Sequence, residues 1–383
     1  MSVTSARGFR AAGATAGLKP SGRPDVALVA NDGPRHDAAA VFTANRCKAN
    51  PVLWTEQAIR DGQLAAVVLN SGVANCYTGH EGFQTTHASA EVVGELLGAG
   101  AIDVAVCSTG LIGQLLDRRK LEDGIQKAAA ALSGSGGPGA AVAIMTTDTR
   151  PKEVAVAGDG WVVGGMAKGA GMLAPALATM LAVLTTDAVA AGPTLDRALR
   201  AATEVTFDRI DTDGCMSTND TVLLMSSGAS GTEPDEAALT AVVTAACADL
   251  AHQLVADAEG AHHEIAIDVV GAVSETDAVE AARSVARSNL FKCAIFGGDP
   301  NWGRVLAAIG TTGAAFDPGA VDVAMNGRWV CRNGAVGEPR EAVDLSARAV
   351  SVTIDLKSGD ASATVLTTDL THDYVHENSA YST

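Results

Sequence analysis

Short apolar runs alternate with longer alanine-rich runs along the whole chain, and this alternation restricts the possible fold more than any other feature. The short runs are rich in Val, Ile and Leu, which favours strands, and the long runs have helical periodicity. We therefore expect strands at Asp25–Ala30, Ala39–Thr43, Ala65–Asn70, Asp103–Cys107, Glu153–Ala157, Met180–Leu184, Thr221–Met225 and Ile265–Val270. Helices are expected at Thr86–Leu97, Thr194–Thr206, Asp235–Ala258 and Ser274–Arg287. This pattern predicts a mixed α/β or α+β fold and is not typical of an all-helical one.

Two ribbons are expected near the C-terminal end. An Asn-Gly dipeptide separates Val321–Met325 from Arg328–Arg332, and this dipeptide favours the type I′ turn of a hairpin. A second ribbon is expected from Ser351–Lys357 and Ser362–Thr367. Earlier in the chain, the run Ser133–Gly139 consists of Gly, Ser and Pro, which predicts a flexible surface loop.

Charge and composition exclude several functional classes. The 383 residues include 44 acidic and 27 basic side chains, a formal charge of −17, which repels phosphate backbones and anionic lipids. We therefore expect neither nucleic acid nor a membrane as a partner. The seven cysteines are widely spaced without a C-x-x-C pair, and the first residues lack the apolar segment of a signal peptide. Both features predict a soluble protein of a reducing cytoplasm, and no metal site is expected.

The most unusual segment is the run Lys168–Leu184, in which a cation and two glycines precede an apolar stretch with one proline and one hydroxyl group, Thr179. The common explanation of such a run is a buried strand with a tolerated threonine. A threonine in a strained peptide can also attack the carbonyl group of the preceding residue, here Ala178, and become the first residue of a new chain. Its freed α-amino group, with an ordinary pKa of roughly 7.7–8.0, can take the hydroxyl proton. Thr179 is therefore a candidate nucleophile.

Acyl transfer also requires hydrogen-bond donors for the developing oxyanion. The expected strand Asp103–Cys107 leads into Ser108–Gly113, a turn in which backbone N–H groups and a hydroxyl group can converge. A helix cap at the exit of a strand is the more common role of Ser-Thr-Gly. The segment is accordingly a candidate source of such donors.

With these residues the chain resembles the ornithine acetyltransferase family, also called the arginine biosynthesis bifunctional protein (glutamate N-acetyltransferase) family. The resemblance extends from Gly8 to Thr383 and rests on separated motifs that occur in the family's order. Besides the two segments above, the motifs are Phe42–Ala49, Asn70–Asn75, Ile144–Thr149, Ser217–Thr221, Glu259–Ala261, Asp299–Arg304, Tyr374-Val375, Asn378 and Thr383. No single motif is specific, whereas their joint order is highly specific.

The resemblance implies a layered αββα sandwich similar to that of the N-terminal-nucleophile hydrolases, with a smaller C-terminal α/β region. It implies self-cleavage between Ala178 and Thr179, so that residues 1–178 become an α chain and residues 179–383 a β chain of an α2β2 heterotetramer. The implied reaction is the ping-pong transfer of an acetyl group from N2-acetylornithine to glutamate, in arginine biosynthesis, through an acetyl ester of Thr179. No cofactor is implied, and acetyl-CoA as an additional donor is left open.

Individual residues acquire roles through the same resemblance. Thr179 is the implied nucleophile, and Thr109 and Gly110 form the implied oxyanion hole. Substrate contacts are implied for Thr146, Lys168, Thr179, Glu259, Asn378 and Thr383. An acylated amino acid offers a carboxylate and, in ornithine, an ammonium group, so Lys168 and Glu259 suit it as partners in charge-assisted hydrogen bonds.

The chain departs from the family pattern near the expected site. Cys215-Met216 stands where Asp-Thr is expected, and His262-His263 replaces Thr-Lys, so both departures leave the substrate preference open. The alternative enzyme is an N-terminal-nucleophile amidohydrolase or aminopeptidase, in which water takes the acyl group in place of an amine. A non-catalytic amino-acid-binding protein is the alternative from another class.

Overall fold

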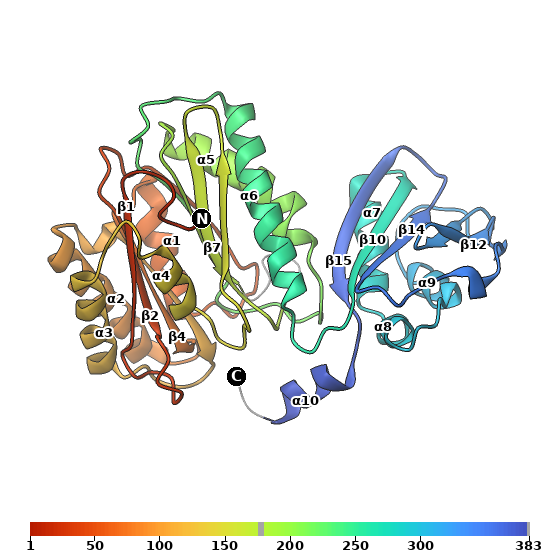
Figure 1. Cartoon of the computed structure of the whole chain (residues 1–383), viewed down its shortest axis with the longest axis horizontal. Coiled ribbons are helices and arrows are strands. Elements are labelled where there is room, and N and C mark those ends of the chain that lie inside the picture. The colour runs from red at the N-terminus through yellow and green to blue at the C-terminus, as the bar shows by residue number, and fades with distance from the viewer. Residues whose placement is uncertain (175–179, 381–383) are drawn as a thin grey trace.

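The computed structural model describes residues 1–174 and 180–380, and Figure 1 shows that they form two lobes. The first and larger lobe contains two packed sheets with helices on both outer faces. The second lobe is built on a third sheet that starts at residue 264. This arrangement confirms the expected mixed α/β fold, the αββα layers and the smaller C-terminal α/β region.

The first sheet has the strand order β1-β2-β4-β5. Its strands are β1 (Phe9–Ala14), β2 (Val26–Asn31), β4 (Ala66–Val73) and β5 (Val104–Leu111). Only β4 and β5 run parallel; the other neighbours are antiparallel. Three helices lie against this sheet, α1 (Asn50–Ala58), α2 (Gly79–Leu97) and α3 (Arg118–Ala130). Apolar side chains of α2 and α3 share a core with the outward face of the sheet.

The second sheet has the order β3-β9-β8-β7-β6. Its strands are β3 (Ala38–Phe42), β9 (Thr221–Ser226), β8 (Leu181–Thr186), β7 (Val162–Lys168) and β6 (Lys152–Ala157). Helices α5 (Gly192–Val205) and α6 (Glu236–Ala256) cover its outer face. Helix α6 is long and apolar enough to cross a membrane, yet it buries Leu239, Val243 and Leu250 in this core, as expected of a core helix.

A continuous apolar layer joins the two sheets. Val29 and Leu69 of the first sheet and Met166 and Val183 of the second are fully buried in one cluster. Helix α4 (Gly137–Ala143) contributes to the same layer.

The run Ser133–Gly139 is only in part the surface loop that was expected. Gly134 and Ser135 are exposed in a turn, but Ser133 pairs with Ala11 of β1, and α4 begins within the run at Gly137. Gly136 packs so tightly that an added Cβ would lie 1.7 Å from the Ala11 carbonyl oxygen. Gly136 therefore permits close packing, which the composition alone does not distinguish from mobility.

The third sheet has the order β13-β12-β11-β14-β10-β15. Its strands are β10 (Glu264–Ala272), β11 (Asp322–Met325), β12 (Arg328–Arg332), β13 (Ala335–Val336), β14 (Ala349–Asp355) and β15 (Ala361–Thr368). The expected Asn-Gly hairpin is confirmed as β11–β12. The second expected ribbon is wrong, because β10 lies between β14 and β15 and pairs with both.

Helices complete the second lobe. They are α7 (Glu275–Ala286), α8 (Asn289–Phe296) and α9 (Trp302–Ile309), with short 3-10 turns elsewhere at Ile59–Asp61, Ala101–Asp103, Phe207–Arg209 and Arg340–Ala342. Ser274 caps α7, because its side chain accepts the Asp277 N–H. Helix α10 (His372–Ala380) leaves this lobe and runs back toward the first (Figure 1).

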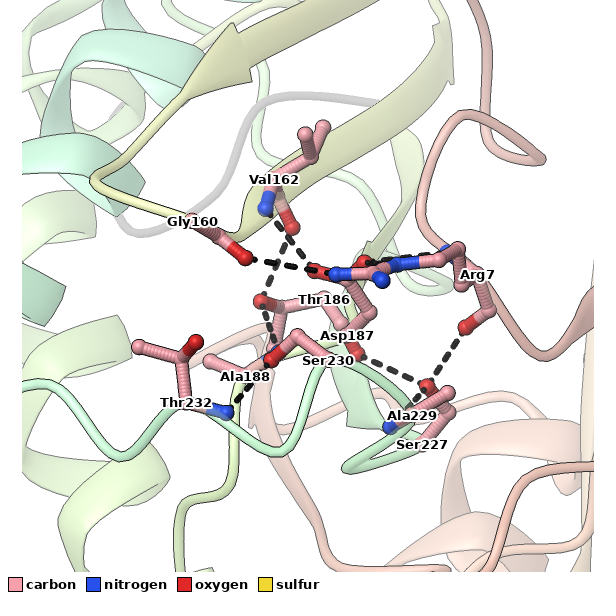
Figure 2. Close-up of polar contacts among 10 residues, drawn as sticks. All are labelled: Arg7, Gly160, Val162, Thr186, Asp187, Ala188, Ser227, Ala229, Ser230 and Thr232. Carbon is pink, nitrogen blue, oxygen red and sulfur yellow. Dashed lines mark hydrogen bonds and ion pairs between the residues drawn. The ribbon is translucent and has the colours of Figure 1, made fainter.

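The antiparallel pair β7–β8 has a polar anchor at the end opposite Lys168. Asp187 is buried there and accepts hydrogen bonds from Arg7 Nε at 2.7 Å and from the Val162 N–H at 2.8 Å (Figure 2). Ser227 Oγ in turn donates to the Arg7 carbonyl oxygen at 2.6 Å. The anchor therefore ties the N-terminal segment to β7, β8 and the end of β9.

We predict that Asp187→Ala lowers the free energy of unfolding by about 2–3 kcal/mol, because it leaves the Val162 N–H without its acceptor and removes the ion pair with Arg7, whose guanidinium then keeps only the Gly160 carbonyl oxygen. Asp32→Ala is the matched control. It removes a comparable ion pair with Arg10, but both side chains are exposed, so we expect a loss below about 1 kcal/mol. Urea unfolding followed by tryptophan fluorescence measures both, and equal losses would contradict the anchor.

Candidate active site

Strands of the two sheets bring Lys168 and Thr109 together. Lys168 is the last residue of β7, and its Nζ donates to the Thr109 hydroxyl oxygen at 3.3 Å. Both side chains are buried. Two residues that are 59 positions apart in the sequence therefore meet where β7 ends.

Thr109 and Gly110 lie inside β5, whereas the sequence predicted a turn at these residues. They pair with Ser71 and Gly72 of β4, next to a register shift between Gly72 and Val73. Gly110 has φ +126°, and an added Cβ would lie 2.3 Å from the Gly72 carbonyl carbon. Only glycine fits this close approach, and the irregularity turns local backbone groups away from the regular ladder.

Asp148 connects the segment that contains Thr146 with the end of β7. Its Oδ1 accepts from Lys152 Nζ at 2.6 Å and from the Gly169 N–H at 2.7 Å, and its Oδ2 accepts from the Thr146 N–H at 2.9 Å. Lys152 also contacts Asp257 at 2.6 Å. Thr146 and Gly169 are consequently held on one carboxylate beside Lys168.

The charges in this cluster shift one another's protonation. Burial lowers the pKa of the Lys168 ammonium group, and the Asp148 carboxylate only partly offsets this effect. Burial alone would raise the pKa of Asp148, but the ammonium groups of Lys168 and Lys152 outweigh it and bring that pKa to about 2. With a pKa of about 2, Asp148 is an anion at neutral pH, which keeps the two lysines compensated.

Glu259 closes the other side of the same backbone. Its N–H donates to the Ala170 carbonyl oxygen at 2.9 Å, and an added Cβ on Gly171 would lie 2.5 Å from its Oε2. Asn378 of α10 donates from Nδ2 to Glu259 Oε2 at 3.0 Å. A hollow of about 330 Å³ lies here, lined in part by Thr149, Glu259 and Glu377.

The described site therefore unites Thr109, Gly110, Thr146, Lys168, Glu259 and Asn378 around the Gly169–Gly171 backbone. Ala178, Thr179 and Thr383 lie outside the described residues. Within residues 1–174 and 180–380, no group of three or more His, Cys, Asp or Glu side chains is arranged to hold a metal ion.

The two departures from the family pattern, at His262-His263 and at Cys215-Met216, lie in different parts of the structure. His262 and His263 bind α10 and its approach, through Nε2···Asp373 at 2.8 Å and Nδ1···Asp369 at 2.7 Å. Cys215 is exposed, in the loop that leads toward β9. The histidines thus contribute to holding the helix that carries Asn378.

Sequence reasoning did not single out several charged residues of this cluster. Asp148 and Asp220 lay within quoted motifs without an assigned role, and Lys152 and Asp257 lay outside them. The one available signal was a charged residue directly before an apolar strand, as at Asp220 before the strand Thr221–Ser226. Such a signal marks a buried charge but does not name its partner.

The layered fold and this cluster of hydroxyl, ammonium and carboxylate groups are those of an α/β enzyme of the acyl-transfer type. The sequence comparison identifies it further. The chain belongs to the ArgJ family, whose model matches residues 10–383. The resemblance noted in the sequence is thereby confirmed.

The chain is also similar to individual named relatives and solved structures. The arginine biosynthesis bifunctional protein ArgJ of Streptomyces coelicolor is 63% identical over 382 residues, with 100% of both chains covered. The crystal structure of ornithine acetyltransferase from Mycobacterium tuberculosis, complexed with ornithine, is 56% identical and covers 45% of this chain and 94% of that chain, with a TM-score of 0.45. The bifunctional protein ArgJ of Bacillus halodurans is 36% identical, covers 51% of this chain and 97% of that chain, and has a TM-score of 0.49.

We predict that Asp148→Asn lowers the free energy of unfolding by at least about 2 kcal/mol at pH 7. The pKa of Asp148 is about 2 in the folded chain and lower than in the unfolded chain, so its stabilisation is complete above roughly pH 4 and is lost as the pH falls toward 2.

The difference between wild type and Asp148→Asn should therefore shrink between pH 4 and pH 2, as measured by urea unfolding at several pH values. Asp235→Asn is the control, since Asn caps a helix as well as the exposed Asp235 does at α6. A difference that stays constant down to pH 2 would contradict the role of the Asp148 charge.

Proposed function

We propose that this chain is an acetyltransferase of arginine biosynthesis that moves the acetyl group of N2-acetylornithine to glutamate, after cleaving itself between Ala178 and Thr179. The observation that carries this function is that the ArgJ family model matches residues 10–383, which include the Lys168–Thr109 contact. Relatives carry the name bifunctional, and the second reaction we propose is acetylation of glutamate by acetyl-CoA. Because a side chain of the enzyme accepts the acetyl group, the transfer requires no cofactor.

Self-cleavage proceeds by attack of Thr179 Oγ on the carbonyl carbon of Ala178. The bond from that carbon to the Thr179 nitrogen breaks, the hydroxyl proton passes to this nitrogen, and an ester replaces the amide. Water then hydrolyses the ester, which leaves a carboxylate on Ala178 and a free α-amino group on Thr179. The products are residues 1–178 and residues 179–383.

Acetyl transfer reuses the same hydroxyl group. Thr179 Oγ attacks the acetyl carbon of N2-acetylornithine, its proton passes to the Thr179 amine and from there to the departing ornithine nitrogen, and an acetyl ester remains. In the second half-reaction the amine of glutamate attacks the ester carbon, the bond from this carbon to Thr179 Oγ breaks, and a proton of the attacking amine passes through the Thr179 amine to Oγ, which releases N-acetylglutamate and restores the hydroxyl group. Thr109 and Gly110 stabilise the oxyanion in both, because Lys168 Nζ donates to Thr109 Oγ1 and so leaves the Thr109 hydroxyl hydrogen for another acceptor.

The remaining site residues bind the amino acid. Glu259 is the partner of the terminal ammonium group of ornithine, and Lys168 and Thr146 lie on the side proposed for the carboxylate. Asn378 orients Glu259 through its hydrogen bond at 3.0 Å, and Thr383 completes the contact set as the last residue of the chain. A site closed by α10 also keeps water from the acetyl ester.

The two fragments are expected to remain together. Strands β8 and β9 of residues 179–383 lie between β3 and β7 of residues 1–178, so separation would break the pairs β3–β9 and β7–β8. The Arg7–Asp187 ion pair joins the same fragments. We propose that two such cleaved pairs form an α2β2 heterotetramer in the cytoplasm, without nucleic acid or membrane partners.

We predict that Thr179→Ala yields an intact chain of 383 residues without transferase activity, because no hydroxyl group remains to attack either carbonyl carbon. Denaturing mass spectrometry and an ornithine-release assay measure the two effects. Thr179→Ser is the control, since it keeps the hydroxyl group and should retain cleavage and part of the activity. Two fragments from Thr179→Ala would refute the nucleophile.

The amidohydrolase alternative predicts a different dependence on glutamate. For the transferase, ornithine release from N2-acetylornithine should stop after about one equivalent per active site when glutamate is absent and should continue when it is added. Release at the same steady rate with and without glutamate would favour hydrolysis. Ligand binding by a permanently uncleaved, inactive chain would favour the amino-acid-binding protein.

A further inference from the structure

One segment, from Asp211 to Thr221, holds the chain on both sides of residues 175–179. On the near side, Asp213 Oδ2 accepts from the Met172 N–H at 2.7 Å, and the Thr212 N–H donates to the Leu173 carbonyl oxygen at 2.6 Å. Each contact involves a main-chain atom of Met172 or Leu173, so it constrains the path of the main chain directly.

The far side is held by the end of the same segment. Asp220 Oδ1 accepts from the Met180 N–H at 3.1 Å, and the Thr221 N–H donates to the Met180 carbonyl oxygen at 3.3 Å. The Met180 nitrogen belongs to the peptide bond that joins it to Thr179. A carboxyl group bound to this nitrogen therefore acts one bond away from the carbonyl group of the proposed nucleophile.

Residue 219 attaches the segment to the strand of the proposed oxyanion hole. Asn219 Nδ2 donates to the Ser108 carbonyl oxygen at 2.8 Å and to the Ala74 carbonyl oxygen at 2.7 Å. Asn219 and Asp220 are consecutive, and both are buried. Together they set how far Met180 lies from Thr109, the residue after Ser108.

The segment is itself anchored, and the chain that it holds is strained. Arg287 Nε donates to Asp211 Oδ2 at 2.7 Å, and Lys292 Nζ donates to the Thr212 carbonyl oxygen. Met172 has φ +55°, a left-handed conformation that a residue with a side chain rarely adopts. Such strain persists only where surrounding contacts hold it, and the Asp213 carboxylate is one of those contacts.

We propose that Asp220, together with Asn219 and Asp213, positions the main chain for self-cleavage and holds the Thr179 hydroxyl group in register with Thr109 and Gly110 for acetyl transfer. This inference rests on the proposed function. Asp220 is a positioning residue: it acts through the Met180 N–H and does not touch the acetyl group.

The effect of replacing Asp220 depends on whether the new side chain still offers an oxygen acceptor to the Met180 N–H. Burial raises the pKa of its carboxyl group well above the ordinary value, so the neutral carboxamide of Asp220→Asn is a close substitute that still offers an oxygen to the Met180 N–H. Asp220→Ala removes the acceptor. A displacement of the reacting atoms by about 1 Å can reduce a rate by up to roughly a hundredfold.

The test compares the rate of self-cleavage, followed by denaturing mass spectrometry of freshly synthesised full chain, with the kcat and KM of the cleaved enzyme. We expect Asp220→Ala to slow cleavage at least about tenfold and to lower kcat by a similar factor with little change in KM, whereas Asp220→Asn stays within about threefold of wild type. Asp213→Ala should slow cleavage as well.

Asp322→Asn is the matched control. Asp322 is also buried and accepts a backbone N–H, from Asn333 at 2.7 Å, but it lies in the third sheet. The Asp322→Asn variant should cleave itself at the wild-type rate. If Asp220→Ala does not fold, judged by circular dichroism, Asp220→Ser and Asp213→Ala replace it, and wild-type cleavage rates in both would overturn the proposal.

Wild-type cleavage and kcat in a folded Asp220→Ala variant would overturn the inference, and so would an Asp220→Asn variant as slow as Asp220→Ala. Failure of the proposed function gives a different result. If the wild-type chain transfers acetyl groups without cleaving, the self-cleavage step is wrong, and kcat alone decides the role of Asp220: an unchanged kcat in Asp220→Ala refutes it.

Discussion

The antiparallel pairing of β7 with β8 is the constraint on which the site depends. It places Lys168 opposite Leu181, so the chain leaves the second sheet after Lys168 and re-enters it at Leu181, at the same end of the strands. The neighbouring parallel pair β8–β9 brings Thr221, and with it Asp220, to this edge. These two pairings place Lys168, Met180 and Asp220 near one another, and the contact of Lys168 with Thr109 adds β5.

Electrostatics at this edge favours a site that is organised before substrate arrives. Lys152 and Lys168 are buried ammonium groups, and burying such charges is costly unless carboxylates compensate them. Asp148 and Asp257 supply that compensation, and Asp148 additionally binds backbone N–H groups. The hydrogen-bond donors of the pocket are consequently fixed by the fold, which is the arrangement that lowers the cost of stabilising an oxyanion.

Local sequence patterns were sufficient to predict most strands and long helices, because the alternation of short and long apolar runs depends only on residues that are close in the sequence. The sequence predicted β10 and the β11–β12 hairpin correctly, but it could not predict that β10 separates β14 from β15, since strand order is decided by packing between distant segments. Helix α2 begins at Gly79, before the expected Thr86, and an added Cβ on Gly82 in its first turn would lie 2.5 Å from Nδ2 of Asn50 in α1. Tertiary contact overrides the low helix propensity of glycine there.

The sequence predicted residues of the candidate site only within the motifs of the family resemblance. Thr109, Gly110, Thr146, Lys168, Glu259 and Asn378 lie around the Gly169–Gly171 backbone, and the roles that the family resemblance implies for them stay predictions. The turn expected at Thr109-Gly110 was wrong, since β4 extends the strand beyond Cys107 by pairing with it. Asp148, Lys152 and Asp220 were not identified, because a charge in the sequence does not reveal the lysine or backbone group, tens of residues away, that compensates it.

The central claim is that the residue after Ala178 carries the acetyl group, and trapping that group tests it most directly. Purified enzyme is mixed with N2-acetylornithine without glutamate, quenched in acid and measured by denaturing mass spectrometry. The account predicts two polypeptides, residues 1–178 and 179–383, with one added acetyl group on Thr179 of the second, which glutamate removes. An acetyl group elsewhere, or an active enzyme that remains one chain of 383 residues, would contradict it.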